Sequence, residues 1–434
     1  MTSCFSMMKK VSLLSALIAG LCSTAPAISS AEDWPTFRGA HRTAVAPDTG
    51  LLQKWPASGP KLLWNQPGAG RGYASLAVAA GRIYTLGVAP STAADKDEYL
   101  VAFDQKTGQQ IWKTKTGEAW TSGKPNWHGS RSCPTVDADR VYCLTPQGVL
   151  VCCATADGKL LWQKNLPTDF EGKKDDKWGY SESVLVDGGL VVCTPGGPKA
   201  TVLALDKLSG DVKWKVSRAG DIGAGHASIV PSDIGGVHVL VQVTGSGPIG
   251  IRAGDGKLLW SYPLEKTTAV IPTPIIRGDL VFFVAGYKRG GALLRQVPEG
   301  DGEVKVQEIY PLKPTLCNKH GGVVLVGDYL YGDSDDQGIP FCANLMTGEI
   351  VWKKRGSGSN SAAFAAADGH LYIRFASGQM VLAKADPKEY VETGSFKIPD
   401  SGEMPSWSHP VISDGKLYLR ELDHILCFDL KPAN

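Results

Sequence analysis

The sequence lacks an excess of charge of either sign. Its 434 residues include 45 lysines and arginines against 43 aspartates and glutamates, which gives a formal net charge of +2. A surface with this balance provides no one-signed field that would hold nucleic acid or an anionic membrane. We therefore expect no nucleic-acid partner.

Two cofactor motifs are also absent. No C-x-x-C-H sequence occurs, which excludes a covalently attached c-type haem. No acidic cluster has the D-x-D-x-D-G spacing of a calcium loop. The clusters at 95–97, 175–176 and 333–336 are therefore expected to be solvated turns.

The one apolar run near the N-terminus is too short to anchor the chain in a bilayer. The run VSLLSALIAGL follows two lysines and precedes the small residues CSTAPAISSA, as in a secretory signal peptide. We predict a signal peptide over residues 1–31, cleaved after Ala31 in preference to Ala27. Leu21 stands directly before Cys22, where a lipoprotein signal needs a small residue, so no lipid anchor is expected. The mature chain is predicted to be soluble and exported, either to the periplasm or out of the cell, with no integral membrane segment.

A repeated hairpin organises the rest of the chain. Several blocks share a glycine four residues before a tryptophan, for example YLVAFDQKTGQQIW and TVLALDKLSGDVKW. We interpret each block as a β-hairpin in which glycine takes the positive φ of the turn and tryptophan packs between sheets. The tryptophans are Trp112, Trp162, Trp214, Trp260 and Trp352.

The spacing of these tryptophans predicts the number of repeats. They recur roughly every 50 residues, and the last gap is about twice as long, which predicts a hidden hairpin at Val306 where tryptophan has been lost. Four strands in each period form a propeller blade. Fourth strands are predicted around Trp64, Trp112, Trp162, Trp214, Trp260, Val306, Trp352 and Phe396.

The two ends of the chain complete each other. The first predicted strand has no partners before it, and the last three strands have no fourth strand after them. Pairing them leaves no open sheet edge. We predict an all-β fold, an eight-bladed β-propeller of four-stranded antiparallel blades over 61–431, with an N-terminal arm over 32–60 packed on it.

The repeat resembles a known family. The pattern A-x-D-x-x-T-G-x-x-x-W, present as AFDQKTGQQIW, is similar to the pyrroloquinoline-quinone-like (PQQ-like) propeller repeat. The opening DWPTFRGAHRTAVAPDTGLLQKWP and the block NKHGGVVLVGDYLYG look like a secreted planctomycete-type subgroup. The family includes quinoprotein alcohol dehydrogenases, a polyvinyl-alcohol-oxidising branch and a non-enzymatic outer-membrane assembly lipoprotein. The resemblance implies the fold, but it leaves the activity open.

The adjacent cysteines Cys152 and Cys153 are expected to be structural. In quinone-dependent enzymes of the family, a disulfide between neighbouring cysteines forms a platform for the cofactor. Here the repeat register places both residues on a third strand, on opposite faces, where such a strained ring would disrupt the ladder. For the other cysteines of the mature chain, the sequence leaves one or two disulfide bonds open and assigns no pairing.

Candidate ligand-binding residues gather in the loops that lead into the first strands. In propellers these loops surround the central channel. They concentrate aromatic rings and polar donors, which suit a sugar, a quinone or a peptide edge. The candidates are Arg71, Tyr73, Asn126, Trp127, His128, Arg131, Trp178, Tyr180, Glu182, His226, Asn318, Lys319, His320, Trp407 and His409. In the arm, four residues also suit a ligand contact, although clamping the arm against the ring is the commoner role: Trp34, Phe37, Arg38 and Arg42.

When the loops that lead into the eight first strands are aligned, the position of Glu182 holds a small residue or proline in every other repeat. Glu182 is the only acidic residue at this position. One interpretation is an ion pair with Arg131, and the other is a ligand or metal contact that makes Glu182 a catalytic candidate. The channel histidines do not share one register, so a symmetric metal ring is not expected.

We predict a propeller that binds a small molecule, a glycan or a protein partner over its channel face, as a monomer and without a catalytic constellation. The alternative is a PQQ-dependent alcohol or polyvinyl-alcohol-type dehydrogenase, for which the resemblance implies PQQ with Ca²⁺. A carbohydrate-cleaving enzyme is a weaker possibility, since it needs two carboxylates.

Overall fold

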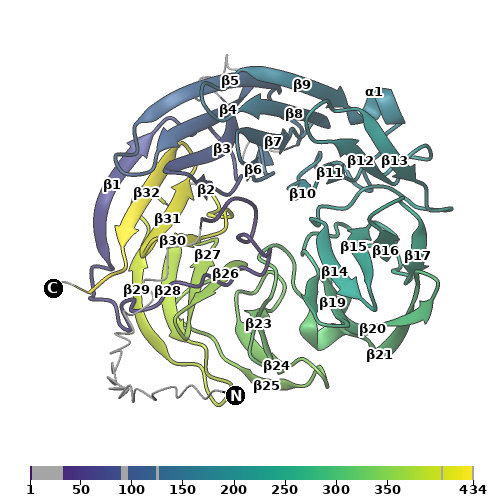
Figure 1. Cartoon of the computed structure of the whole chain (residues 1–434). Helices are drawn as coiled ribbons and strands as arrows, with labels where there is room; N and C mark the ends of the chain where they lie inside the picture. The colour runs from purple at the N-terminus through teal and green to yellow at the C-terminus, as the bar shows by residue number, and fades with distance from the viewer. Residues whose placement is uncertain (2–32, 89–95, 124–126, 402–403, 433–434) are drawn as a thin grey trace. The chain divides into compact units, whose positions relative to one another are not determined.

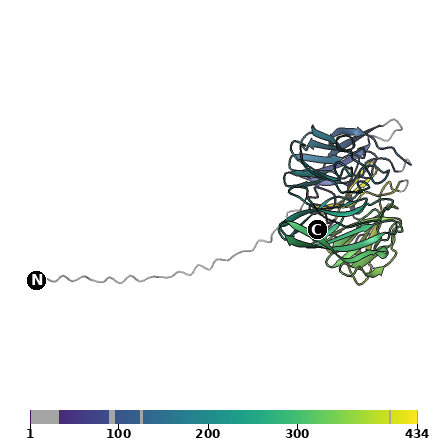
Figure 2. The same ribbon diagram turned by 90° about the vertical axis from the view of Figure 1, so that its right-hand side faces the viewer.

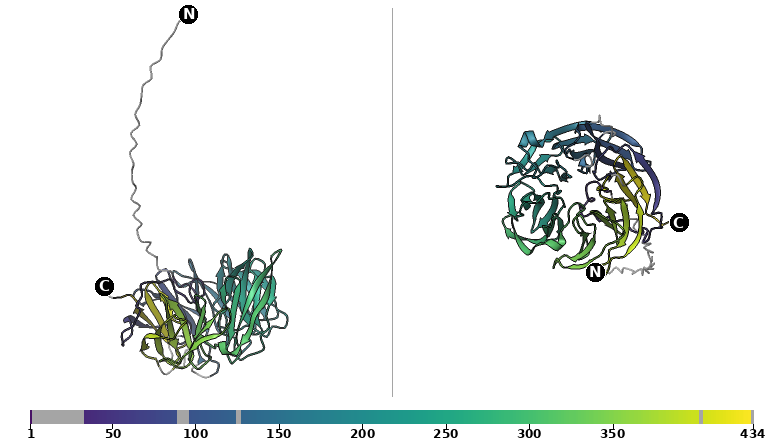
Figure 3. Two further views of the ribbon diagram at one scale, coloured as in Figure 1. Left: turned by 90° about the horizontal axis from the view of Figure 1, so that it is seen from below. Right: turned by 180° about the vertical axis from the view of Figure 1, so that it is seen from behind.

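The computed structural model describes Met1 and residues 33–88, 96–123, 127–401 and 404–432. The strands form eight four-stranded sheets arranged around a ring (Figure 1). The ring is seen from its edge in Figure 2, and from below and behind in Figure 3. The prediction of an eight-bladed all-β propeller is confirmed. Apart from Met1, the predicted signal peptide lies outside the described residues.

Seven blades consist of four strands that follow one another in sequence. The first blade contains β2 (Ala77–Ala79), β3 (Arg82–Val88), β4 (Asp97–Asp104) and β5 (Gln110–Glu118), the second β6 (Thr135–Asp137), β7 (Arg140–Leu144), β8 (Val149–Ala154) and β9 (Leu160–Asn165), and the third β10 (Leu185–Asp187), β11 (Leu190–Cys193), β12 (Val202–Asp206) and β13 (Val212–Val216). The fourth blade contains β14 (Val230–Ile234), β15 (Val237–Thr244), β16 (Gly247–Arg252) and β17 (Leu258–Ser261), and the fifth β18 (Ile275–Arg277), β19 (Leu280–Ala285), β20 (Gly290–Gly300) and β21 (Glu303–Lys313). The sixth blade contains β22 (Val324–Val326), β23 (Tyr329–Asp333), β24 (Pro340–Asn344) and β25 (Ile350–Lys353), and the seventh β26 (Ala362–Ala367), β27 (His370–Phe375), β28 (Gln379–Lys384) and β29 (Glu392–Lys397).

Helices are few and short. α1 (Leu166–Phe170) follows β9, and the 3-10 turn η2 (Pro314–Leu316) follows β21. Within the described ranges, no helix has the length and apolar character needed to cross a membrane.

The eighth blade joins the two ends of the propeller, as predicted. Its strand order is β1 (Lys61–Pro67), β32 (His424–Asp429), β31 (Lys416–Glu421) and β30 (Val411–Ser413). β1 is antiparallel to β32, with Trp64 opposite Cys427. The outermost strand of this blade, β1, therefore comes from the N-terminal end of the propeller, and the other three strands come from its C-terminal end. Their pairing closes the ring and leaves no unpaired strand edge where the chain ends meet.

The glycine and tryptophan of the repeat contact each other across blades. Gly158 has a φ of 75° in its turn, and a Cβ there would lie 2.6 Å from the ring of Trp112 in the preceding blade. Trp112 also donates from Nε1 to the carbonyl oxygen of Thr155, at 3.0 Å. Glycine is therefore needed both for the turn and for the close approach of the indole.

The hidden repeat is present, but its aromatic residue is not at Val306. Val306 lies on β21, as predicted for a fourth strand. The ring that covers the next hairpin glycine, Gly348, belongs to Tyr310, and the Tyr310 hydroxyl donates to the carbonyl oxygen of Leu345 at 3.0 Å. β20 and β21 form a longer hairpin than the others, which moves the aromatic position four residues along the strand.

The cysteine pair is structural, as the register predicted. Cys152 and Cys153 lie on β8, and both are fully buried. Cys152 packs in the apolar cluster shared with the following blade, and Cys153 in the cluster shared with the preceding one. All eight cysteines of the described ranges are free, so none of the disulfides left open by the sequence is formed there.

The N-terminal arm crosses the centre of the ring. Trp34 forms a β-bridge with Val78 in the first blade, and Val45 forms one with Ala366 of β26. In Figure 1 the arm is the purple segment that runs through the middle of the propeller. It therefore contacts the inner strands of blades that are distant in sequence.

Candidate functional site

The loops that lead into the first strands surround a cavity of about 280 Å³ at one end of the channel. Seven of the eight blades contribute to its wall, and the arm supplies Phe37 and Arg38. Because each blade presents its innermost strand to the axis, residues far apart in sequence converge here. A cavity of this size accommodates a small molecule but not a folded partner.

Many of the predicted candidates line this cavity. They are Tyr73, Trp127, Arg131, Trp178, His226, Lys319, His320, Trp407 and His409. The loop positions predicted from the repeat register therefore converge, and their role in binding a ligand stays a prediction.

The other candidates lie elsewhere. The Tyr180 hydroxyl donates into a blade, to the carbonyl oxygen of Pro195, and the Asn318 amide donates to the carboxylate of Asp333. Arg71 forms a backbone bridge to Val88. His128 is outside the cavity lining, and its Nε2 is buried without a hydrogen-bond partner. Asn126 lies outside the described residues.

Aromatic side chains form two walls of the cavity. Trp127 and Trp178 contact each other edge to face, with ring centroids 4.6 Å apart. On the other wall, Trp407 lies 4.9 Å from the ring of Tyr73 and 5.0 Å from that of His320. These contacts fix the rings, so the cavity offers flat, preformed apolar faces.

The arm arginines are held by backbone carbonyl groups rather than by carboxylates. Arg38 donates to the carbonyl oxygen of Val323 at 2.7 Å, and Arg42 donates to those of Ser183 at 2.9 Å and Ile229 at 3.1 Å. Burial lowers the pKa of both guanidinium groups to about 10. Both stay charged at neutral pH, and Arg38 adds positive charge to the cavity.

The cavity lining carries cations and no carboxylate among the described residues. Its charged side chains are Arg38, Arg131 and Lys319. Arg131 donates to the carbonyl oxygens of Trp127, Gly129 and Trp178. A guanidinium has five N–H groups, so these three bonds leave others for a ligand.

The three cavity histidines are neutral at neutral pH. Burial lowers the pKa of His226 to about 4, with a further contribution from Lys174. Burial and Lys319 lower that of His320 to about 4, and burial and Arg38 lower that of His409 to about 3. The imidazole rings therefore act as hydrogen-bond groups rather than as cations.

Glu182 does not face the cavity. Its side chain is 2% exposed and accepts hydrogen bonds from the backbone N–H of Thr194 at 2.7 Å and from the amide of Gln242 at 3.2 Å. No ion pair joins it to Arg131 in the described structure, so that interpretation is wrong: the Arg131 guanidinium is turned toward loop carbonyls. Burial raises the pKa of Glu182 to about 8 despite the hydrogen bonds from Thr194.

Two of the acidic clusters are not solvated turns. The side chains of Asp175 and Asp176 are 2% and 7% exposed, and Asp333 is fully buried on β23. The prediction failed because a distant segment covers Asp175 and Asp176: Lys174, directly before them, forms a β-bridge with Ala224. Of these two clusters, 333–336 keeps an exposed carboxylate at its end, Asp336, which pairs with Lys319.

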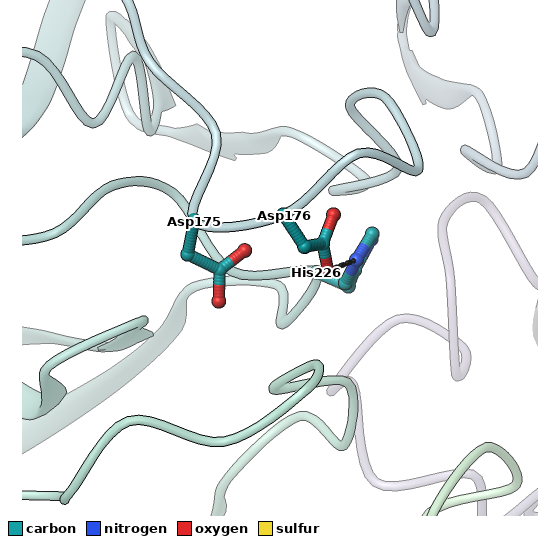
Figure 4. A group of neighbouring side chains, drawn as sticks. All are labelled: Asp175, Asp176 and His226. Atoms are coloured by element: carbon teal, nitrogen blue, oxygen red, sulfur yellow. Dashed lines mark hydrogen bonds and ion pairs between the residues drawn. The ribbon is translucent and has the colours of Figure 1, made fainter. Parts of the chain in front are cut away.

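Asp175, Asp176 and His226 form a compact group beside the cavity (Figure 4). One ligand atom from each lies within 4.8 Å of the others. However, the Lys174 ammonium already lies 3.8 Å from the Asp175 carboxylate, and His226 uses both ring nitrogens in hydrogen bonds. The lysine offsets one of the two carboxylates and both nitrogens of His226 are already hydrogen-bonded, so we assign no metal to the group.

Sequence reasoning missed Ser181 and Asp176. Ser181 lines the cavity, and its Oγ lies 2.5 Å from Nδ1 of His226. The opposite nitrogen, Nε2, lies 2.7 Å from Oδ2 of Asp176. The only signal in the sequence was position: both residues lie in the same loop as Trp178.

Comparison with known proteins gives the family. A family model described as outer membrane protein assembly factor BamB matches residues 26–119 and 96–354. The chain belongs to this family. Its PQQ-like repeats are therefore those of BamB-type propellers.

Individual BamB relatives are distant. The outer membrane protein assembly factor BamB of Yersinia pestis is 22% identical over 303 residues, which cover 65% of this chain and 70% of the relative. The crystal structure of BamB from Moraxella catarrhalis matches with a TM-score of 0.58 and 14% identity, over 86% of this chain and 98% of that one.

Dehydrogenases share the BamB-type fold of this chain. A europium-containing methanol dehydrogenase matches with a TM-score of 0.63 and 12% identity, over 89% of each chain. A quinohemoprotein alcohol dehydrogenase from Comamonas testosteroni matches with a TM-score of 0.63 and 14% identity, over 93% of this chain and 81% of that one. At these identities the likeness shows the fold alone.

The cavity of this BamB-family chain does not fit a Ca²⁺-bound quinone. Ca²⁺ requires six to eight oxygen ligands, with carboxylates among them. Within the described residues no carboxylate lines the cavity, and two carboxylates next to lining residues, Asp176 and Asp336, are bonded to His226 and Lys319. The cysteine pair is buried within β8, so it provides no cofactor platform.

Proposed function

We propose that this chain is an exported cell-envelope propeller that binds a small planar acid in the channel-face cavity. The observation that carries the proposal is the lining: flat aromatic faces beside the Arg131 guanidinium, whose protein acceptors are carbonyl groups, with no carboxylate among the described lining residues. A ring with one carboxylate satisfies both features, because the ring stacks on indole and the carboxylate accepts from guanidinium N–H groups.

The export and envelope location are supported by the signal-like N-terminus and by the family of the outer membrane assembly factor BamB. The small volume of the cavity, about 280 Å³, favours a small molecule over a protein edge or a long glycan.

A matched pair of probes tests this function. We expect 4-nitrobenzoate to bind to the purified protein at least about tenfold more tightly than 4-nitrobenzamide, because a charge-assisted hydrogen bond contributes about 1.5–3 kcal/mol. Isothermal titration calorimetry and quenching of tryptophan fluorescence measure both probes. Equal affinity for the acid and the amide, or binding of neither, would contradict the proposal.

Arg131 is the residue to change. Arg131→Gln is expected to remove the preference for the acid, and Arg131→Lys is expected to keep most of it, since a point charge remains. The amide serves as an internal control, because a variant with a collapsed cavity loses both probes.

The quinone-dependent alternative makes a different prediction. Since the cavity lining provides no carboxylate for Ca²⁺, we expect no dye reduction by alcohols when PQQ and Ca²⁺ are added together. Ca²⁺-dependent turnover under these conditions would restore the dehydrogenase hypothesis and show that a ligand set forms on binding.

A further inference from the structure

Three residues beside the cavity form one continuous hydrogen-bonded chain. Asp176 accepts from the backbone N–H of Trp178 at 2.9 Å through Oδ1, and its Oδ2 lies 2.7 Å from Nε2 of His226. On the other side of the ring, Nδ1 lies 2.5 Å from the hydroxyl oxygen of Ser181. Ser181 and His226 both line the cavity, and Asp176 lies behind them.

The protonation states in this chain follow from its chemistry. Burial is the largest influence on the pKa of Asp176 and raises it, but the hydrogen bond from His226, the charge of Lys174 and the backbone N–H of Trp178 together lower the pKa below its usual value. An ionised carboxylate only accepts, so Nε2 of His226 carries the ring proton. The ring is neutral at neutral pH, and Nδ1 is left as an acceptor for the Ser181 hydroxyl proton.

We propose that Ser181 is the nucleophile of an acyl-transfer site that hydrolyses small carboxylic esters. His226 is the base, Asp176 holds its tautomer, and Arg131 faces the same cavity with N–H groups for the developing oxyanion. The order serine, histidine, aspartate is that of a hydrolytic triad, although here serine meets Nδ1 rather than Nε2.

The reaction balances with water as the only co-reactant. Oγ of Ser181 forms a bond to the ester carbonyl carbon while its proton moves to Nδ1 of His226. The tetrahedral anion then expels the alcohol oxygen, which takes the proton from Nδ1. Water attacks the acyl-Ser181 ester, with its proton passing to Nδ1, and the acid leaves as Ser181 regains its proton.

The environment of His226 predicts a slow enzyme. The ring is surrounded by Lys174, Arg131, Asp175, Asp176 and His320, and burial with the neighbouring cations makes the imidazole a weak base. Acylation by an activated ester is therefore expected to be easier to observe than turnover of an alkyl ester.

The test uses the whole exported chain and 4-nitrophenyl acetate. We expect release of 4-nitrophenolate together with an acetyl group on Ser181, located by mass spectrometry of acid-quenched protein. Ser181→Ala should abolish the adduct and lower the release rate about a hundredfold. Ser209→Ala, which removes an exposed hydroxyl in an outer turn, should change neither.

Two further variants separate chemistry from structure. His226→Gln should remove acylation. Asp176→Asn should slow acylation because the amide favours the wrong tautomer, while the affinity for 4-nitrobenzoate and the unfolding temperature stay unchanged. A loss of rate that merely follows a loss of folding in both variants would contradict the assignment.

The inference rests on the proposed function only in that the cavity admits a small molecule. Binding of 4-nitrobenzoate without acetyl-Ser181 would overturn the esterase proposal and leave the binding function intact. Acetylation of Ser181 with no preference for the acid over the amide would support the esterase proposal and contradict the proposed binding of a planar acid. Release that persists in Ser181→Ala, with acetyl groups on lysines, would overturn the esterase proposal.

Discussion

Replacing Arg420 with methionine is expected to lower the free energy of unfolding by about 4 kcal/mol. Arg420 lies on β31 in the last blade and is fully buried. Its guanidinium donates to the carbonyl oxygens of Gly70 at 2.9 Å and Ala74 at 3.2 Å, and to the hydroxyl of Thr85 at 2.8 Å. These acceptors belong to the first blade and the loop before it, so one side chain joins the two ends of the ring.

The magnitude follows from the acceptors that methionine leaves behind. Each buried polar group without a partner costs about 1–3 kcal/mol, and several carbonyl groups lose their donor together. Arg252→Met is the matched control, because Arg252 pairs with Asp255 in an exposed turn and the substitution should leave the free energy of unfolding nearly unchanged. Denaturation in urea, followed by tryptophan fluorescence, measures both. A loss below about 1 kcal/mol for Arg420→Met would show that β1 alone closes the ring.

Glu182→Gln is expected to stabilise the protein at high pH by about 3 kcal/mol and to have little effect at pH 5. The folded-state pKa of Glu182 is raised from 4.5 to about 8, mainly by burial. Between these values the folded chain holds a proton that the unfolded chain has released, so stability falls as pH rises through this window. Glutamine resembles the protonated form and does not titrate.

The difference between the two proteins is the quantity to measure. Unfolding free energies of wild type and Glu182→Gln should converge below about pH 5 and separate up to about pH 8. Other carboxyl groups with raised pKa values, such as Glu98, contribute equally to both proteins and cancel. A parallel pH dependence in the two proteins would mean that Glu182 is ionised in the folded protein, where the positive charge of Arg42 favours the carboxylate.

The fold was predictable because each repeat is specified by residues that lie close together in the sequence. A glycine with positive φ and a tryptophan four residues later recur in five of the hairpins, and the structure uses both residue types at the contact between neighbouring blades. Where the hairpin lengthens, at β20 and β21, the same contact is made by Tyr310, and spacing alone pointed to Val306.

The site was predictable only as a region. Repeat register identified the loops that converge, and it placed Trp127, Trp178 and Trp407 on one cavity. Register did not reveal which way a side chain turns within a crowded channel. Glu182 turns into its blade toward Thr194.

Burial by distant segments was also invisible in the sequence. In the sequence, Asp176 resembles an exposed turn residue. In the structure its side chain is buried, because the segment around Ala224 covers the loop that contains it. Arg38 reaches the cavity only because the arm crosses the channel, a path that no local pattern specifies.

Anomalous diffraction from crystals soaked in 4-iodobenzoate tests the central claim most directly. The account predicts one iodine peak inside the channel-face cavity, with the ring against Trp407 or the Trp127–Trp178 pair and the carboxylate at Arg131. An iodine peak at another surface with the cavity unoccupied, or the carboxylate turned away from Arg131, would contradict it.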